Sequence, residues 1–132
     1  MSDPPAQFSD PFYLRRFPTD RRKIGKAYEI QAEKYLADNG YRILERNYCG
    51  SHGEIDRIAR AADGTIVFVE VKARRTLGWG SGGEAVDSAK RRHIRLTARA
   101  YIYEKGLSFN GSFRFDVILF EKGQLIHIEN AF

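Results

Sequence analysis

Three ionisable side chains interrupt two apolar segments near the middle of this 132-residue chain. Asp56 ends the segment Gly-Glu-Ile-Asp, and Glu70 and Lys72 lie within the segment Val-Phe-Val-Glu-Val-Lys. Ionised groups in such a setting are costly unless a partner or a metal compensates them. Two carboxylates on adjacent strands can provide the oxygen ligands that a hard divalent cation such as magnesium prefers. The three residues are therefore candidates for a metal site.

Such a site would suit the hydrolysis of a phosphodiester. A divalent cation between Asp56 and Glu70 would polarise the phosphodiester and lower the pKa of a bound water, which makes that water a nucleophile at neutral pH. Lys72 would position the water or stabilise the charge that develops on the phosphate. The alternative is an ion pair on an edge strand, in which Glu70 and Lys72 neutralise each other at the surface. The spacing alone leaves both interpretations open.

The two apolar segments are expected to be neighbouring strands joined by a turn that ends in Asp63-Gly64, which is a hairpin signal. If the turn centres on Asp63, Asp56 lies opposite Glu70, with about 5 Å between their Cβ atoms. Side chains alternate along a strand, so Glu70 and Lys72 share one face. The hairpin would thus gather the three charges, whereas a shift of one residue would separate them.

The rest of the pattern predicts an α/β domain. Apolar residues at helical spacing predict one helix from about residue 19 to 39, ended by Gly40, and a second helix over residues 84–105. Five strands are expected, over residues 41–48, 54–59, 65–72, 113–120 and 124–129. This order predicts a single mixed five-stranded sheet with helices packed on it.

One domain is expected over residues 19–132. Residues 1–18 contain all four prolines of the chain and are expected to form an irregular N-terminal arm. The arm is either a disordered terminus or a segment whose aromatic side chains dock on the domain or on a neighbouring subunit.

The composition indicates an anionic partner. The formal net charge of +5 at pH 7 favours nucleic acid or, less specifically, an acidic membrane surface. Cys49 is the only cysteine, so an internal disulfide is excluded and a reducing, cytoplasmic setting is expected. No window reaches the apolar length of a membrane span, and the N-terminus lacks the apolar core of a secretory signal.

Four segments of the chain resemble the YraN family of small bacterial proteins. They are Gly-Lys-Ala-Tyr-Glu at residues 25–29, Gly-Glu-Ile-Asp at 53–56, Phe-Val-Glu-Val-Lys-Ala-Arg at 68–74 and Asn-Ala-Phe at 130–132. That family belongs to the PD-(D/E)XK nuclease superfamily and is similar to archaeal Holliday junction resolvases. The resemblance covers the chain from about Lys23 onward. It implies a restriction-endonuclease-like core and an endonuclease that depends on Mg²⁺ or Mn²⁺.

The resemblance also implies an active site, residue by residue. It places Asp56 and Glu70 as metal ligands, with the backbone carbonyl of Val71 as a further ligand. Lys72 would serve the attacking water. Glu29 would add an acid from the first helix and is a further candidate ligand. Without the resemblance, Glu29 would be interpreted as a solvated glutamate or as the partner of a nearby lysine.

Two residues depart from the family pattern. Tyr28 stands where a glycine is common and could crowd the approach to Glu29. Arg57 stands where an apolar residue is usual and could place a positive charge beside the sheet. Outside the motif, Asp116 interrupts another apolar strand. It is expected to pair with Arg114 or a neighbour in the sheet, without a catalytic role.

Basic residues follow the third strand and continue into the second helix, where they form a ridge at a spacing of four. They are the candidates for a phosphate-binding surface. By default such a run is a solvated helix face. The nucleic-acid-binding candidates are Arg74, Arg75, Lys90, Arg91, Arg92, Arg95 and Arg99.

The leading hypothesis is a metal-dependent nuclease that hydrolyses phosphodiester bonds in DNA, with branched or damaged structures as candidate substrates. One alternative is a nucleic-acid-binding module that keeps the nuclease fold without catalysis. Another is an interaction protein that dimerises through its arm or a sheet edge. A homodimer is also compatible with the nuclease hypothesis, since related resolvases act as dimers.

Overall fold

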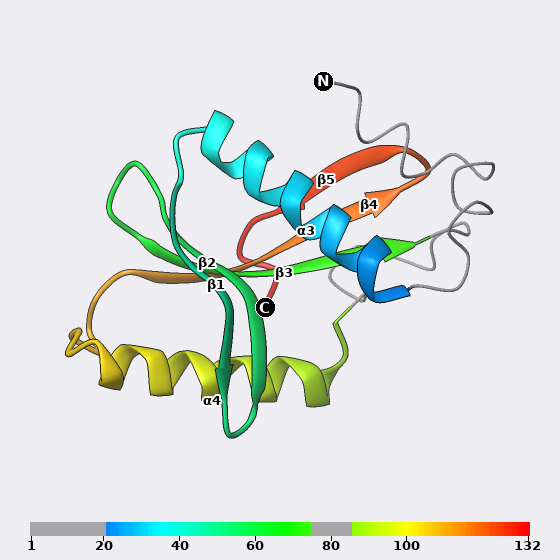
Figure 1. Cartoon of the computed structure of the whole chain (residues 1–132). Coiled ribbons are helices and arrows are strands. Elements are labelled where there is room, and N and C mark those ends of the chain that lie inside the picture. The colour runs from blue at the N-terminus through cyan, green and yellow to red at the C-terminus, as the bar shows by residue number, and fades with distance from the viewer. Residues whose placement is uncertain (1–20, 75–85) are drawn as a thin grey trace.

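The computed structural model describes residues 21–74 and 86–132. This part of the chain contains two helices and five strands in the predicted order (Figure 1). The helices are α3 (Arg21–Asp38) and α4 (Ser88–Glu104). The strands are β1 (Arg42–Gly50), β2 (Gly53–Arg60), β3 (Ile66–Arg74), β4 (Phe113–Glu121) and β5 (Gln124–Ile128). The arm expected over residues 1–18 lies outside the described residues.

The strands form one sheet in the order β1-β2-β3-β4-β5. β3 and β4 are parallel, whereas every other neighbouring pair is antiparallel. A parallel pair requires a crossover connection, and α4 lies in it. α3 covers one face of the sheet and α4 covers the other (Figure 1). The predicted α/β fold, a mixed five-stranded sheet flanked by helices, is therefore confirmed.

α3 packs on the sheet through a buried stripe at helical spacing. Its most buried apolar side chains are those of Tyr28, Ala32 and Leu36. They form a core with Val67 and Val69 of β3. Glu29, the neighbour of Tyr28, borders this stripe and is half-buried, as predicted. The helix ends at Asp38, and the positive φ of Gly40 confirms its predicted terminating role.

α4 begins later than the sequence predicts. The Asp87 carboxylate accepts the N–H of Lys90 at 2.9 Å and caps the helix, so that Ser88 is its first residue. The predicted start at residue 84 is therefore wrong, because residues 86–87 are not helical. The helix buries one side against the sheet face opposite α3, through Ile94, Thr97, Ala98, Tyr101 and Ile102.

The hairpin of β2 and β3 has the predicted register. Its four paired positions are symmetric about Asp63 and end with Arg57 opposite Val69. The next step would place Asp56 opposite Glu70. Pairing between β2 and β3 stops at this point, whereas β3 stays paired with β4 to its last residue. The two strands therefore separate where the two acids lie.

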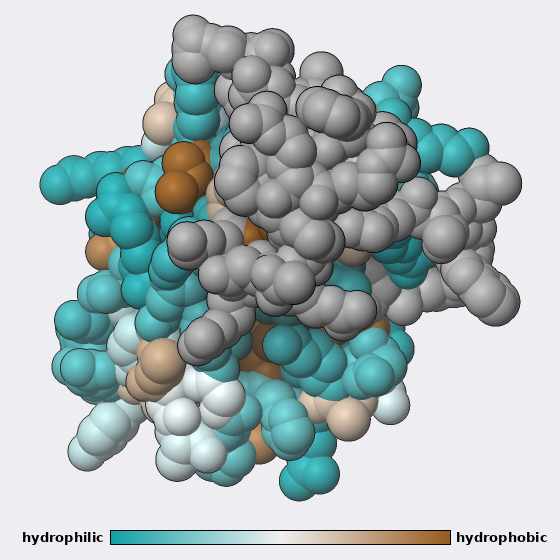
Figure 2. Space-filling model, turned by 45° about the vertical axis from the view of Figure 1, so that its right-hand side comes forward, coloured by the Kyte–Doolittle hydropathy of each residue, from teal (hydrophilic) through white to brown (hydrophobic). Residues whose placement is uncertain are grey.

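The face shown in Figure 2 is mostly hydrophilic over its described residues. On the face shown in Figure 2, polar and charged side chains surround small hydrophobic spots. Large exposed hydrophobic side chains occur singly on different segments, at Ile30, Tyr103, Phe109 and Ile126, which is common in soluble domains. Within residues 21–74 and 86–132, neither helix is long and apolar enough to cross a membrane.

Asp116 lies at the centre of a buried polar network between β4, β5 and α3. Its side chain is 0% exposed and accepts hydrogen bonds from Arg114, from the ring of His127 and from the backbone N–H of Asn130. The predicted pairing with Arg114 is confirmed. Burial alone would raise the pKa of Asp116, but the bonds from His127 and Arg114 outweigh it and lower the pKa. The network reaches α3 because Tyr35 hydrogen-bonds His127 at 3.0 Å.

Removing the Asp116 carboxylate should destabilise the fold. Asp116→Ala leaves Arg114 and His127 without their shared acceptor, so we expect the free energy of unfolding to fall by about 3–5 kcal/mol. Urea denaturation measures this change. The control Asp38→Ala removes an exposed carboxylate paired with Lys34 and should cost under about 1 kcal/mol. Equal losses in the two variants would contradict the central role of the Asp116 network.

Candidate active site

Where the backbone pairing of β2 with β3 ends, the Asp56 side chain takes over as a hydrogen-bond acceptor for β3. Its Oδ2 accepts the backbone N–H of Val71 at 2.8 Å. In a strand, the N–H and C=O groups of one residue point to the same neighbouring strand. The Val71 carbonyl therefore also faces β2, on the side where Asp56 lies. Its role as a metal ligand remains a prediction.

Glu70 is a buried acid with one oxygen left unpaired. Its side chain is 10% exposed, and its Oε2 lies 3.2 Å from the Nζ of Lys90 on α4. Its Oε1 is enclosed and has no hydrogen-bond partner among the residues that the structure describes. Leaving a buried polar oxygen unpaired costs roughly 1–3 kcal/mol, and more for a charged group. Such an atom in a native fold indicates a place for an ion, a water or a ligand.

Lys72 is exposed and is not the ion-pair partner of Glu70. Glu70 lies on β3, between β2 and β4, and its ion pair is with Lys90. The alternative interpretation, an edge-strand pair of Glu70 and Lys72, is therefore wrong. Burial raises the pKa of Glu70, and the charges of Lys90 and then Lys72 are near enough to oppose that rise. Lys72 thus stands close to the acids with an exposed side chain.

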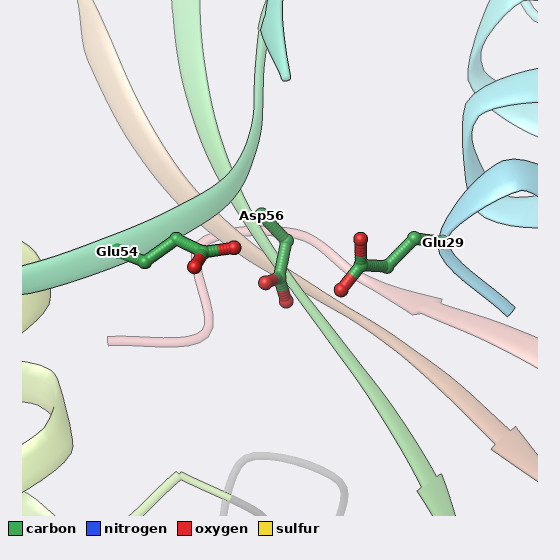
Figure 3. A group of neighbouring side chains, drawn as sticks. All are labelled: Glu29, Glu54 and Asp56. Carbon is green, nitrogen blue, oxygen red and sulfur yellow. The ribbon is translucent and has the colours of Figure 1, made fainter. Parts of the chain in front are cut away.

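Glu29, Glu54 and Asp56 converge at the same place. Glu29 extends from α3, while the other two project from β2, and the three carboxylates point toward one another (Figure 3). One oxygen of each lies within 4.8 Å of the others. The structure therefore brings Glu29 to Asp56, as the resemblance implies, and adds Glu54. Residues two apart on a strand share a face, so the spacing of Glu54 and Asp56 was a signal for this contact.

Asn47 of β1 joins two of these acids. Its Nδ2 donates to Glu29 Oε1 at 3.0 Å and to Glu54 Oε2 at 2.5 Å. The backbone of Asn47 has a positive φ of 49°, which asparagine tolerates better than most residues. No local pattern in the chain predicts this contact, because it joins α3, β1 and β2. The interpretation of Glu29 as a solvated or lysine-paired residue is wrong, since its partners are Asn47 and Arg57.

Arg57 places a positive charge beside the sheet, as predicted. Its side chain is 2% exposed; its Nε lies 2.9 Å from Glu33, and NH1 lies 3.4 Å from Glu29. Tyr28, the other departure from the family pattern, is buried, and its ring packs against Phe120 with 4.8 Å between the centroids. The Tyr28 ring thus lies in the core under α3.

The acids at the strand separation have raised pKa values. Burial, followed by the charge of Glu70, raises the pKa of Asp56 to about 8 against the opposing hydrogen bond from Val71. Burial likewise raises the pKa of Glu70. Two neighbouring carboxylates with raised pKa values in a partly enclosed site are candidates for function. A bound cation would stabilise their ionised forms.

The donor set fits a hard divalent cation. Four acids, Glu29, Glu54, Asp56 and Glu70, each use one carboxylate oxygen for a contact within the protein. The second oxygen of Glu70 has no hydrogen-bond partner among the described residues, and one oxygen each of Glu29, Glu54 and Asp56 lies within 4.8 Å of the others. Mg²⁺ and Mn²⁺ prefer such oxygen ligands. The residues present therefore fit the cofactor that the resemblance implies.

The predicted nucleic-acid-binding residues have different environments. Lys90 contacts Glu70, and Arg99 lies over the ring of Phe109 with 6.0 Å to its centroid. Arg95 lies 5.3 Å from the centroid of the Phe132 ring. Arg91 is half-buried, and Arg92 is exposed on α4. Arg74 ends β3, whereas Arg75 lies outside the described residues. Their binding role remains a prediction.

Residues 28–120 match the family described as "Uncharacterised protein family UPF0102". The chain belongs to this family. The resemblance to the YraN family is thereby confirmed, since the two names denote one family. A UPF0102 protein of Sulfurihydrogenibium sp. (strain YO3AOP1) is 44% identical over 86% of this chain and 96% of the relative. A UPF0102 protein of Burkholderia pseudomallei (strain 1710b) is 38% identical over 85% of this chain and 76% of the relative.

Two solved structures are similar to part of this UPF0102 protein. A repair endonuclease from Pyrococcus abyssi is 17% identical, with a TM-score of 0.46 over 76% of this chain and 38% of that chain. The EndoMS–dsDNA complex is 20% identical, with a TM-score of 0.42 over 67% of this chain and 34% of that chain. This chain spans less than half of either one. The likeness concerns the fold alone.

The raised pKa of Asp56 predicts how stability depends on pH in the metal-free protein. Between its ordinary value of 3.8 and about 8, the folded state holds a proton that the unfolded chain has lost. The free energy of unfolding should therefore fall as the pH rises through this range. Asp56→Asn keeps an acceptor for the Val71 N–H but does not ionise. In this variant the free energy of unfolding should depend less on pH, and at about pH 9 it should be higher than in the wild type.

Thermal unfolding in EDTA at about pH 5, 7 and 9 measures this effect. The control Asp38→Asn, which removes an exposed carboxylate at the end of α3, should keep the wild-type slope. A profile of Asp56→Asn parallel to that of the wild type would contradict the raised pKa.

Proposed function

We propose that this protein is a restriction-endonuclease-like nuclease that hydrolyses phosphodiester bonds in DNA with Mg²⁺ or Mn²⁺, with branched or damaged structures as candidate substrates. The enclosed, unpartnered Oε1 of Glu70 beside Asp56 carries the proposal. A buried carboxylate oxygen without a donor is costly unless a cation approaches it. The proposal rests on the side chains of this chain and on the resemblance to PD-(D/E)XK nucleases.

Each member of the site has a defined task. Asp56 and Glu70 would hold the cation with the Val71 carbonyl, and the Val71 N–H fixes the orientation of the Asp56 carboxylate. A divalent cation there supplies polarisation of the phosphodiester and a lower pKa for water. Glu29 adds a carboxylate from α3, next to Asp56.

Lys72 supports the chemistry from the same strand as Glu70. Residues two apart on a strand share a face, and Lys72 is exposed where a substrate could reach it. Its ammonium group would hold the attacking water or stabilise charge on the phosphate. Lys90 of α4 holds the second oxygen of Glu70, and Oε1 stays without a partner among the described residues.

Two basic regions would receive the DNA backbone. The first comprises Arg74 at the end of β3 and the α4 residues Lys90, Arg91, Arg92, Arg95 and Arg99, together with Arg75, which lies outside the described residues. The second is an open hollow of about 480 Å³. Asn47 and Arg57 line it, and both also contact Glu29. Lys26, Lys34 and Arg46 also line this hollow, with Glu33 as its acid. Basic residues near an acidic centre suit a phosphodiester chain that passes across it.

The cellular setting and assembly complete the proposal. Cys49 is a free, exposed cysteine, which is compatible with the reducing cytoplasm. A homodimer would allow two symmetric strands to be cut. The alternatives are a module that binds nucleic acid without catalysis and a dimerising interaction protein. The first would bind DNA without a metal requirement, and the second would not bind it.

Cleavage assays test the proposed activity. Purified protein should cut branched or linear DNA in the presence of Mg²⁺ or Mn²⁺ but not in EDTA. Glu70→Ala and Lys72→Ala should each lower the rate by at least about 100-fold, because Glu70 would hold the cation and Lys72 would act at the attacking water or the phosphate. Gel analysis of labelled substrates measures the rates. The control Asp38→Asn should cut at the wild-type rate, and activity that survives in both site variants would exclude the assignment.

The salt dependence of DNA binding tests the basic surface of α4. Arg92→Ala removes an exposed charge and should weaken binding of duplex DNA. If Arg92 contacts a phosphate, the slope of log affinity against log salt concentration should fall by about 1. Fluorescence anisotropy in a salt series measures the slope. The control Lys122→Asn removes a charge from the β4–β5 turn and suits the positive φ of 53° there. Equal slope changes in both variants would show only a non-local charge effect.

A further inference from the structure

We propose that the open hollow lined by α3 and β1 binds the phosphate of an unpaired nucleotide, with the buried Arg57 as one of its ligands. The resemblance does not assign this site, because Arg57 stands where the family pattern usually has an apolar residue. The inference deepens the proposed function and rests on it, since a nuclease gives a nucleotide a reason to lie beside Glu29 and Asp56.

Arg57 is a buried cation with one donor group left over. Its side chain is 2% exposed, and its Nε donates to Glu33 at 2.9 Å. Its NH1 has three acceptors, which are Glu29, Asn47 and the backbone carbonyl of Asp56. The NH2 group has no hydrogen bond to any residue that the structure describes, and it is not one of the enclosed unpaired atoms. Since Arg57 lines the hollow, this donor is available to a ligand there.

Arg57 and Arg46 share a single carboxylate. The Nε of each lies 2.9 Å from Oε1 of Glu33, the acid among the described residues that line the hollow. One carboxylate does not neutralise two guanidinium groups, so an anion beside them would be stabilised. Guanidinium groups bind phosphate through paired N–H donors. The inner wall of the hollow is therefore suited to a phosphate.

Two lysines of α3 add further positive charge to the hollow. Lys34 pairs with Asp38 at 2.9 Å, whereas Lys26 contacts the neutral amide of Asn47 at 3.3 Å. The Arg46 side chain is 62% exposed, and Lys26 is exposed as well. Both side chains can therefore turn toward a ligand without leaving the core. A phosphate in the hollow would gain Lys26 as a second cationic partner besides the arginines.

An apolar side chain in the hollow favours a nucleotide over a phosphate alone. Ile30 is 58% exposed and lines the hollow together with Ala37. The volume of about 480 Å³ lies within the usual range for small-molecule sites. Unstacked bases pack against apolar side chains in proteins that bind them. The bases of a duplex are covered by their stacked neighbours, so an unpaired nucleotide is the form that offers both a phosphate and a base.

The hollow and the acids are connected by shared contacts. Asn47 and Arg57 line the hollow, and both also contact Glu29. Arg57 NH1 donates to the backbone carbonyl of Asp56 at 2.7 Å. A nucleotide in the hollow would therefore lie next to the proposed cleavage site. This position would select DNA with unpaired nucleotides, as at a branch, over intact duplex.

Nucleotide binding in EDTA tests the inference. Without a metal the crowded acids repel a phosphate, so binding reports on the hollow. Titration of the full-length protein with dAMP should give saturable shifts in the amide NMR signals of Asn47 and Arg57. Inorganic phosphate should bind more weakly than dAMP, and deoxyadenosine should bind more weakly than both. Equal affinities for dAMP and inorganic phosphate would overturn the role of the base, and equal affinities for dAMP and deoxyadenosine would overturn that of the phosphate.

Two variants test the residues of the hollow. Arg57→Lys keeps a charge beside Glu33 but removes the NH2 donor, and Lys26→Gln removes an exposed charge without disturbing the core. Each should weaken dAMP binding by about 10-fold or more, because each removes a hydrogen bond to a charged group. The controls Lys122→Asn and Arg92→Ala, which remove charges from the β4–β5 turn and from α4, should bind dAMP as the wild type does. Wild-type affinity in Lys26→Gln would overturn the inference, even if Arg57→Lys failed to fold.

Competition with DNA tests the preference for an unpaired nucleotide. A single-stranded oligonucleotide should displace dAMP from the wild-type protein, whereas a blunt duplex of the same sequence should leave dAMP bound. Equal displacement by the two DNA forms would overturn this preference.

These results can be told apart from failure of the proposed function. Binding of dAMP that depends on Arg57 and Lys26, in a protein that cuts no DNA, would support the inference and contradict the nuclease. Cleavage that depends on Asp56 and Glu70, with wild-type dAMP affinity in both hollow variants, would support the nuclease and overturn the inference.

Discussion

The hydrogen bond between the Asp56 carboxylate and the Val71 N–H is the contact on which the site depends. It forms where β2 leaves β3, while β3 continues beside β4. The carboxylate satisfies a backbone donor that a longer hairpin would have paired. The same contact holds Asp56 near Glu70, on the side to which strand geometry also points the Val71 carbonyl. The end of strand pairing thereby brings the carboxylates of Asp56 and Glu70 close together.

Each helix adds a charged side chain to the acids of the β2–β3 hairpin. α3 brings Glu29 to Asp56, and α4 brings Lys90 to Glu70. Crowded acids oppose folding without a cation, as the raised pKa of Asp56 indicates. The rest of the domain must therefore hold α3 firmly against the sheet. The apolar core under α3 and the Asp116 network, which lies on β4 beside Val69 of β3, provide that support.

Whether a feature could be predicted from the sequence depends on how far apart its residues lie along the chain. The register of the β2–β3 hairpin could be predicted because the turn and the alternation of side chains are local. The start of α4 was missed because the Asp87 cap stops a helical pattern that continues upstream. Strand order is not local, so the sequence could not exclude an edge-strand pair of Glu70 and Lys72. The same limit hid Lys90 as the partner of Glu70.

The group of Glu29, Glu54 and Asp56 could be predicted only in part. The resemblance identified Glu29, and the two-residue spacing of Glu54 from Asp56 was visible in the sequence. The role of Asn47 depends on three elements meeting and on a left-handed backbone. The most direct test of the central claim is a crystal structure with Mn²⁺ and its anomalous difference map. We expect a peak in contact with Asp56 and Glu70 Oε1; a Glu70 Oε1 bonded to a protein donor, with no peak beside it, would contradict a metal site at these two acids.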